Sequence, residues 1–215
     1  IKRIRYMTSH PNDMSDSLID VHGNNLKLMP FLHLPIQSGS DNVLKKMNRK
    51  HNVKKYYQII DKLKSMRSDI ALSSDFIVGF PGETDEDFKQ LYGFVEEVEF
   101  DRLGVFTYSE EEGTHGASLK DDVPMEIKTE RMDAIMMLQQ DINLKKNQAL
   151  VGKNERVLID SHSENGTSIG RSYRDAPEVD NFIRIDNELP IGEFIDVKIT
   201  AASEYELIGE QLKIE

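Results

Sequence analysis

The chain has 215 residues, of which 38% are hydrophobic and 30% are charged, a balance that suits a globular protein with a core of ordinary size. Its formal net charge of -11 opposes unassisted binding to a polyanion, because nucleic-acid affinity comes largely from lysine and arginine. No run approaches the roughly 20 apolar residues of a membrane helix, and the first residues lack the apolar stretch of a signal peptide. We therefore expect a cytoplasmic protein without a membrane partner.

The chain contains no cysteine, which excludes a disulfide scaffold and any metal centre held by thiolates. Its histidines show no metal-ligand spacing such as i and i+4, so no metal site is predicted. No catalytic side chain is predicted either, because the carboxylates of residues 110–112 are typical of a solvated loop. Since the chain begins at Ile1 and not at Met, we expect it to be the C-terminal part of a longer protein.

From residue 2 to about residue 109, short apolar runs alternate with amphipathic stretches, as in βα units with a parallel sheet. Small or polar residues follow each predicted strand, at the end where α/β sheets place ligands. The predicted strands are residues 4–7, 31–36, 70–78 and 102–108.

Two helices between these strands are marked by capping residues. One begins after Asn52, a typical N-cap, and the other after Thr84, where Asp87 forms a variant of the capping box. The first is expected to bury Val53, Tyr56, Tyr57, Ile60 and Leu63. The second is expected to bury Phe88, Leu91, Val95 and Val98.

A longer helix over residues 125–150 has Pro124 before its start and Gly152 past its end, as helices prefer. After it, short alternating strands are separated by turn signals such as Asn165-Gly166, which predicts a small five-stranded OB-like barrel. The strands expected are residues 156–159, 168–170, 182–185, 194–200 and 205–208. The chain thus divides into an α/β part (1–123), a connecting helix (124–150) and an all-β domain (151–215).

Two polar loops at strand ends are candidates for a ligand site. After the second strand, Gln37 and Ser38 offer neutral donors and acceptors suited to a hydroxyl-rich or zwitterionic molecule; the competing interpretation is that Ser40 or Asp41 only caps the next helix. The turn over residues 79–82, Gly-Phe-Pro-Gly, allows close backbone approach beside a helix N-terminus; a tight βα turn would explain it as well. Two such loops at adjacent strand ends favour one shared pocket.

Several long motifs resemble those of the radical S-adenosylmethionine (SAM) methylthiotransferases. They are Ile-Arg-Tyr-Met-Thr-Ser-His-Pro at 4–11, His-Leu-Pro-Ile-Gln-Ser-Gly-Ser-Asp at 33–41, Met-Asn-Arg at 47–49, Asp-Phe-Ile-Val-Gly-Phe-Pro-Gly-Glu-Thr at 75–84, and the stretch 106–114. The C-terminal barrel resembles the TRAM domain of that family.

The resemblance implies the C-terminal portion of a partial (β/α) barrel, with the strands here as its third to sixth. It also implies SAM and 4Fe-4S clusters as cofactors of the full-length enzyme, with the cluster cysteines upstream of this chain. The SAM-binding residues that it implies are Gln37, Ser38, Ser74, Asp75, Val78, Gly79 and Tyr108.

Within that family, the first half is most similar to enzymes that modify an isopentenyladenosine of tRNA. The second half is most similar to those that modify an aspartate of a small-subunit ribosomal protein, which leaves a recombined chain as one interpretation. Residues 151–215 hold 14 acidic and 7 basic residues, a balance of 7 - 14 = -7, so a basic ribosomal protein is the favoured partner and tRNA the alternative. The substrate-binding residues expected are Arg171, Arg174, Glu178 and Asp180.

Two other classes of function stay open at this point. One is a non-catalytic binding module, in which a remnant of the α/β barrel carries a substrate-docking C-terminal domain. An ordinary phosphate-binding TIM-type enzyme would require eight βα units and would leave the C-terminal barrel unexplained.

Overall fold

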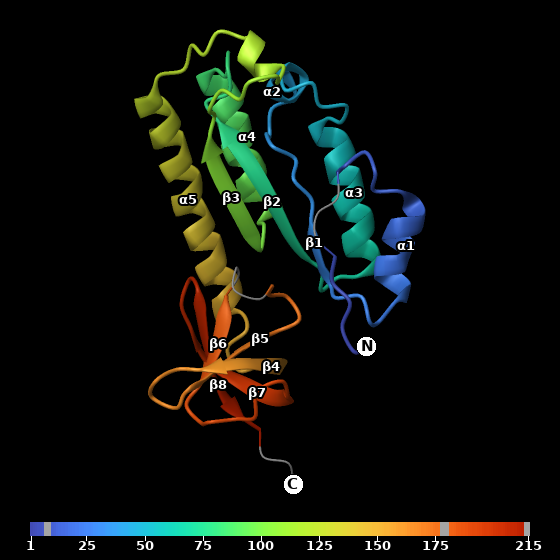
Figure 1. Ribbon diagram of the computed structural model, residues 1–215. Helices are drawn as coiled ribbons and strands as arrows, with labels where there is room; N and C mark the ends of the chain where they lie inside the picture. Colours follow the sequence, from blue (N-terminus) through green and yellow to red (C-terminus); the bar gives the residue numbers. More distant parts are fainter. Residues whose placement is uncertain (7–9, 177–180, 213–215) are drawn as a thin grey trace. The chain divides into compact units, whose positions relative to one another are not determined.

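The computed structural model describes residues 1–6, 10–176 and 181–212. The chain divides into two compact units, Ile1–Gln139 and Gln140–Glu215, whose boundary falls inside the helix Met125–Gln148. The first unit is α/β and the second is a closed five-stranded barrel, so the predicted fold class is confirmed (Figure 1).

The first unit is built on a parallel sheet in the order β1-β2-β3. Its strands are β1 (Phe31–His33), β2 (Ala71–Val78) and β3 (Arg102–Thr107). The helices are α1 (Asp16–Asn24), α2 (Asp41–Lys46), α3 (Val53–Met66), α4 (Asp85–Val98), the 3-10 helix Gly116–Ser118 and α5 (Met125–Gln148).

The first predicted strand does not form. Ile4 makes only an isolated parallel bridge with Leu28, and Met7 lies outside the described residues. The ladder does not continue, because the N–H of Phe31, which would be the next donor in this parallel register, is bonded to the Met29 carbonyl at 2.8 Å. In contrast, α1 was not predicted, since only Ile19 and His22 of its residues are buried and its apolar stripe is weak.

The helices α3 and α4 begin where the sequence indicates. The Asn52 side chain accepts a hydrogen bond from the backbone N–H of Lys55, and Thr84 and Asp87 form a complete capping box. Most of the expected core residues of the two helices are buried, but three are only partly so: Val53, Tyr57 and Phe88. The Tyr57 hydroxyl reaches the surface because it donates a hydrogen bond to the exposed carboxylate of Glu97.

An aromatic cluster joins these two helices to one face of the sheet. Tyr56 of α3 and Phe94 of α4 have ring centroids 5.7 Å apart, and Phe76 of β2 meets Phe94 at 6.2 Å and Phe100 at 5.6 Å. Because side chains alternate along a strand, Phe76 and Ser74 face these helices, whereas Ser73, Asp75 and Ile77 point to the opposite face. That opposite face carries the candidate site.

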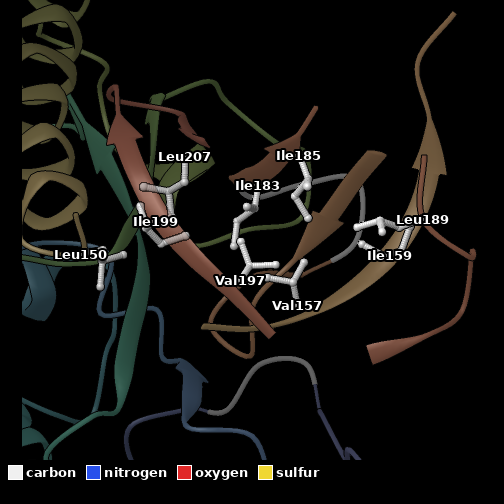
Figure 2. Packing of buried hydrophobic residues seen from close by; sticks show 9 residues of the cluster. All are labelled: Leu150, Val157, Ile159, Ile183, Ile185, Leu189, Val197, Ile199 and Leu207. Carbon is white, nitrogen blue, oxygen red and sulfur yellow. The ribbon is translucent and has the colours of Figure 1, made fainter. Parts of the chain in front are cut away.

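The second unit closes in the strand order β4-β5-β6-β8-β7. All its strand pairs are antiparallel except β6 with β8. Figure 2 shows the side chains that fill the barrel, among them Val157, Ile183 and Val197, each fully buried. The strands are β4 (Asn154–His162), β5 (Ser168–Arg171), β6 (Phe182–Ile185), β7 (Phe194–Ala202) and β8 (Glu206–Gln211).

Candidate functional site

A hollow of about 490 Å³ lies where the C-terminal ends of β2 and β3 meet the loop after β1. This is the end of a parallel sheet at which ligands bind. Its lining comes from β2, β3, the loop after β1, the segment after α2 and the loop that follows β3. The polar lining residues are Gln37, Arg49, Asp75, Thr107, Tyr108, Ser109, Glu111, Thr114 and His115.

Gln37 enters this hollow with an unusual backbone. Its φ is +80°, a left-handed conformation that side chains other than glycine rarely adopt. The backbone N–H of Gln37 donates to the carbonyl of Asp75 at 3.1 Å, and its own carbonyl accepts from Ile77 at 3.0 Å. The loop is thus held against β2 by backbone hydrogen bonds, and such strain is concentrated at functional sites.

Asp75 belongs to a polar row on the sheet face that lines the hollow. Its Oδ2 lies 3.4 Å from Nε2 of His33, and Nδ1 of His33 lies 2.9 Å from the hydroxyl of Ser73. Gly104 on β3 makes room for this carboxylate, because a Cβ atom there would lie 2.7 Å from Oδ1 of Asp75. His33 and Ser73 were not predicted as site residues. The alternation of side chains along a strand could have indicated them, since His33, Ser73 and Asp75 share one face of the sheet.

Tyr108 follows β3 and closes one side of the hollow. Its hydroxyl is buried and has no hydrogen-bond partner in the described part of the chain. An unpaired buried hydroxyl is costly and is commonly satisfied by a ligand or water. On the other side of the ring, Nζ of Lys128 lies 5.1 Å from the ring centroid and donates to the Tyr108 carbonyl at 3.2 Å.

Arg49 lines the same hollow although it was not predicted as a site residue. Its guanidinium is half-buried, and burial lowers its pKa from the usual value. Within the described residues it makes no ion pair with a carboxylate, so it brings an uncompensated positive charge to a hollow that Gln37 and Tyr108 also line. A guanidinium in this position suits a carboxylate or phosphate.

Ser38 and Ser74 do not line the hollow. The Ser38 hydroxyl accepts from the backbone N–H of Ser40 at 3.2 Å, and Ser40 is the N-cap of α2, as the competing interpretation of this loop required. The Ser74 hydroxyl accepts from Ile36 N–H and donates to the Leu34 carbonyl, both at 3.2 Å. Ser74 thus bonds β2 to the segment before Gln37, and Ser38 stabilises the turn into α2.

Val78 and Gly79 have backbone groups that are already engaged. The Val78 carbonyl accepts from Tyr108 N–H at 2.9 Å, and Gly79 N–H donates to Oε1 of Glu83 at 2.8 Å. Gly79 has a φ of +70°, and a Cβ atom on it would overlap the side chain of Lys128. These two residues shape the turn beside the hollow and do not line it.

The turn over residues 79–82 is anchored to α5 by a buried ion pair. Nη1 of Arg131 lies 2.8 Å from Oε1 of Glu83, and Nη2 lies 2.8 Å from Oδ1 of Asp85. Burial raises the pKa of Glu83, although the Gly79 N–H and Arg131 both favour its charged form. Lys128, one turn away, pairs with Asp121. These contacts fix the β2 and β3 ends that border the hollow.

The residues predicted to bind substrate lie in the second unit. Arg171 pairs with Asp160 at 2.6 Å, and Arg174 contacts the Tyr173 hydroxyl at 2.7 Å and Glu155 at 3.3 Å. Glu178 and Asp180 lie outside the described residues. No group of three or more His, Asp or Glu side chains in the described ranges is arranged to hold a metal ion. None of the helices described is long and apolar enough to cross a membrane.

Comparison with protein families gives two matches. Residues 1–95 match the radical SAM superfamily, and residues 151–212 match the TRAM domain. Among solved structures, the E. coli coproporphyrinogen III oxidase HemN, described as a radical SAM enzyme, is similar over 66% of this chain and 33% of that one, with a TM-score of 0.54 and 19% identity. That similarity supports the fold of the first unit.

Curated relatives carry two kinds of name. A tRNA-2-methylthio-N(6)-dimethylallyladenosine synthase of Rickettsia akari is 47% identical over 99% of this chain and 47% of its own length. Ribosomal protein uS12 methylthiotransferase RimO of Thermosipho melanesiensis is 44% identical over 96% of this chain and 48% of its own length. RimO of Lachnoclostridium phytofermentans is 42% identical over 97% of this chain and 48% of its own length. The chain spans about half the length of these relatives.

Proposed function

Because the chain belongs to the radical SAM methylthiotransferase family, we propose that the protein transfers a methylthio group to an aspartate of ribosomal protein uS12. The observation that carries the choice of substrate is the charge of the TRAM domain, whose balance is 7 - 14 = -7 over residues 151–215. A lysine- and arginine-rich ribosomal protein is complementary to that charge.

The hollow in the first unit is the proposed site for the organic part of SAM. Gln37, Asp75 and Tyr108 line it and are the residues that would hold this zwitterionic, hydroxyl-bearing molecule. The fit is supported by the Tyr108 hydroxyl, which lacks a partner among the described residues, and by the Asp75 carboxylate, which suits an ammonium or a ribose hydroxyl. When bound, SAM supplies the radical chemistry, and these side chains orient it.

The other four residues expected in the SAM site would not touch SAM but would support the segments that do. Ser38 and Ser74 fix the Gln37 loop, and Val78 and Gly79 shape the turn anchored by Glu83. The chain does not fit an iron-sulfur cluster, because it contains no cysteine to supply thiolates. We place no cluster ligand among its residues.

In the second unit, the arginines support a protein substrate more than a nucleic-acid one. Arg171 and Arg174 have carboxylate partners at 2.6 and 3.3 Å, so their charges are largely compensated before any phosphate approaches. We propose that Arg171, Arg174, Glu178 and Asp180 bind the basic protein substrate, and that the two arginines hold neighbouring carboxylates in place.

The second candidate is modification of the dimethylallyladenosine of tRNA, because the relative from Rickettsia akari carries that name at 47% identity. A non-catalytic docking module is a third, and SAM-dependent activity of the protein would exclude it. The deciding experiment incubates the cluster-reconstituted full-length enzyme with SAM, a sulfur source and either purified uS12 or unmodified tRNA. Mass spectrometry should detect one added methylthio group on a uS12 peptide. Modification of the tRNA nucleoside with unmodified uS12 would overturn the proposal.

A further inference from the structure

His33 lies behind the Asp75 carboxylate, where β1 runs beside β2. Its Nε2 faces Oδ2 of Asp75 at 3.4 Å, and its Nδ1 lies 2.9 Å from the Ser73 hydroxyl. The register of the two strands pairs His33 with Ser73, so the parallel sheet itself sets the place of the ring. Asp75 lines the hollow of about 490 Å³, whereas His33 does not. The imidazole therefore acts on a ligand in this hollow through Asp75.

The donor and acceptor roles in this row follow from the carboxylate. A charged carboxylate can only accept hydrogen bonds, so the nitrogen that faces Asp75, Nε2, is assigned the proton. Nδ1 is then an acceptor, and the hydroxyl of the buried Ser73 donates to it. Ser73 thus fixes the tautomer and the orientation of the ring. In the described part of the chain, no other side chain bonds to the Asp75 carboxylate or pairs with it.

The two oxygens of the Asp75 carboxylate have different surroundings. Oδ2 faces His33, whereas Oδ1 lies on the side of Gly104, where a Cβ atom would come within 2.7 Å of it. Glycine at this position of β3 therefore leaves space beside Oδ1. A carboxylate with one oxygen held and the other unobstructed is preorganised to accept a hydrogen bond from a ligand, because less freedom is lost on binding.

The row contains the residue types of a hydrolytic triad, but in the reverse order. In such a triad the serine faces the substrate, and the carboxylate is buried behind the histidine. Here Asp75 lines the hollow, whereas Ser73 is only 8% exposed and does not line it. The row therefore presents no nucleophile to the hollow, and the carboxylate is the end that meets a ligand.

We infer that His33 is a positioning residue, which holds the Asp75 carboxylate in the orientation that accepts a hydrogen bond from SAM. This role rests on the proposed binding of SAM in the hollow, and it belongs to a residue that does not touch SAM itself. A ring that only filled space between the strands would support folding, but its removal would weaken SAM binding independently of Asp75. The coupling between the two side chains is therefore the property to measure.

The test is a double-mutant cycle on the Kd of SAM, measured by calorimetry with the cluster-reconstituted full-length enzyme. The cycle consists of H33A, D75A and the double variant H33A/D75A. H33Q and H33N distinguish the two ring nitrogens, because a glutamine amide lies near the position of Nε2 and an asparagine amide near that of Nδ1. The matched control is H162A, which removes a barrel histidine whose Nε2 lies 2.7 Å from the Leu189 carbonyl. Circular dichroism confirms that each variant is folded.

We expect D75A to raise the Kd of SAM about thirtyfold and H33A about tenfold, and the double variant to bind no more weakly than D75A alone. H33Q should stay within about threefold of the unmodified enzyme, because it keeps a donor for Asp75, whereas H33N should resemble H33A. H162A should leave the Kd unchanged. In steady-state assays, H33A should raise the KM for SAM and leave the KM for the acceptor substrate as it is.

Each other outcome has a distinct meaning. Unchanged SAM binding in H33A, with weakened binding in D75A, would overturn the role of His33 and leave the SAM site standing. A double variant weaker than D75A by the whole factor of H33A would overturn it as well, because the two side chains would then act independently. Binding by H33Q as weak as that of H33A would exclude the contact through Nε2.

Full-strength SAM binding by D75A would overturn the proposed SAM site, and the role of His33 with it. If H33A does not fold, H33Q and H33N, which keep a polar side chain, decide by the same comparison of their Kd values. None of these outcomes depends on whether uS12 or tRNA is modified, so they are distinguishable from a failure of the proposed substrate.

Discussion

The guanidinium of Arg131 on α5 contacts Oε1 of Glu83, in the turn after β2, at 2.8 Å, and both side chains are almost completely buried. Glu83 in turn accepts the N–H of Gly79 at 2.8 Å. The ends of β2 and β3 that border the proposed SAM site thus depend on a helix that begins about 40 residues later in the chain.

Removal of one partner of this buried pair should destabilise the first unit strongly. Arg131→Met leaves a buried carboxylate without its cation, and we expect a loss of about 3–5 kcal/mol in the free energy of unfolding. Urea denaturation followed by circular dichroism measures it. The exposed pair of Lys89 and Glu86 is the control, because Lys89→Met should cost less than about 0.5 kcal/mol. Equal effects of the two substitutions would contradict the anchoring role of Arg131.

Substitution of Gly79 should show whether the turn over residues 79–82 needs a glycine at this position. Gly79→Ala places a methyl group against Lys128 at a φ of +70°, and we expect a loss of about 2–4 kcal/mol from backbone strain and overpacking. Gly93, on the exposed side of α4, has no atom within 4 Å of the position that a methyl group would take, so Gly93→Ala should stabilise the chain by up to about 1 kcal/mol. Thermal unfolding of the two variants should therefore shift in opposite directions. A stable Gly79→Ala variant would show that the turn adjusts freely.

Asp87 should make stability depend on acidic pH. Burial disfavours its charged form, but hydrogen bonds from Ser40, Thr84 and Asn42 outweigh this and hold its pKa below the usual value. A depressed carboxylate pKa stabilises the folded state above the unfolded pKa of about 3.9, and that stability is lost as the pH falls through the lowered folded pKa. The stability difference between the unmodified chain and Asp87→Asn should thus be constant from pH 7 to about pH 5 and shrink below about pH 4.

Urea denaturation at a series of pH values checks this dependence. Glu86→Gln, on the exposed side of the same helix, is the control for removal of a carboxylate and should change the free energy of unfolding at neutral pH by less than about 0.5 kcal/mol. A stability difference for Asp87→Asn that stays constant down to about pH 3 would mean that the hydrogen bonds at Asp87 do not depend on its charge.

The pKa of His22 should report its burial in α1. Its ring is fully buried, and burial followed by the charge of Arg67 lowers its pKa below the usual 6.5. The Tyr6 hydroxyl lies 2.7 Å from Nε2 of the neutral ring. Imidazole resonances in an NMR titration should therefore show His22 titrating below pH 6.5. Titration of His22 at or above pH 6.5 would contradict its buried, neutral state.

The sequence predicted the elements that depend on local signals. The caps at Asn52 and Thr84, the three strands of the sheet and the five strands of the barrel follow from capping chemistry and alternation, and the structure confirms them. The candidate site was predicted less completely. Gln37, Asp75 and Tyr108 line the hollow, but Ser74 faces the helices because it lies one position from Asp75 on an alternating strand.

The residues that were missed depend on contacts between distant segments. Arg131 and Glu83 are 48 positions apart, and nothing in the local sequence of α5 indicates that its basic residues bury themselves against the turn after β2. Likewise, His33 gains its place beside Asp75 only through the register of β1 with β2. Such pairs become visible only when the fold brings the segments together.

The choice of substrate is tested most directly by deletion of the gene that encodes the protein, followed by mass spectrometry of both uS12 and tRNA nucleosides from the same cells. Our proposal predicts that uS12 loses one methylthio group from an aspartate, that tRNA methylthiolation is unchanged, and that a plasmid-borne copy restores the modification of uS12. Loss of the methylthio group from the tRNA nucleoside, with uS12 unaffected, would contradict it.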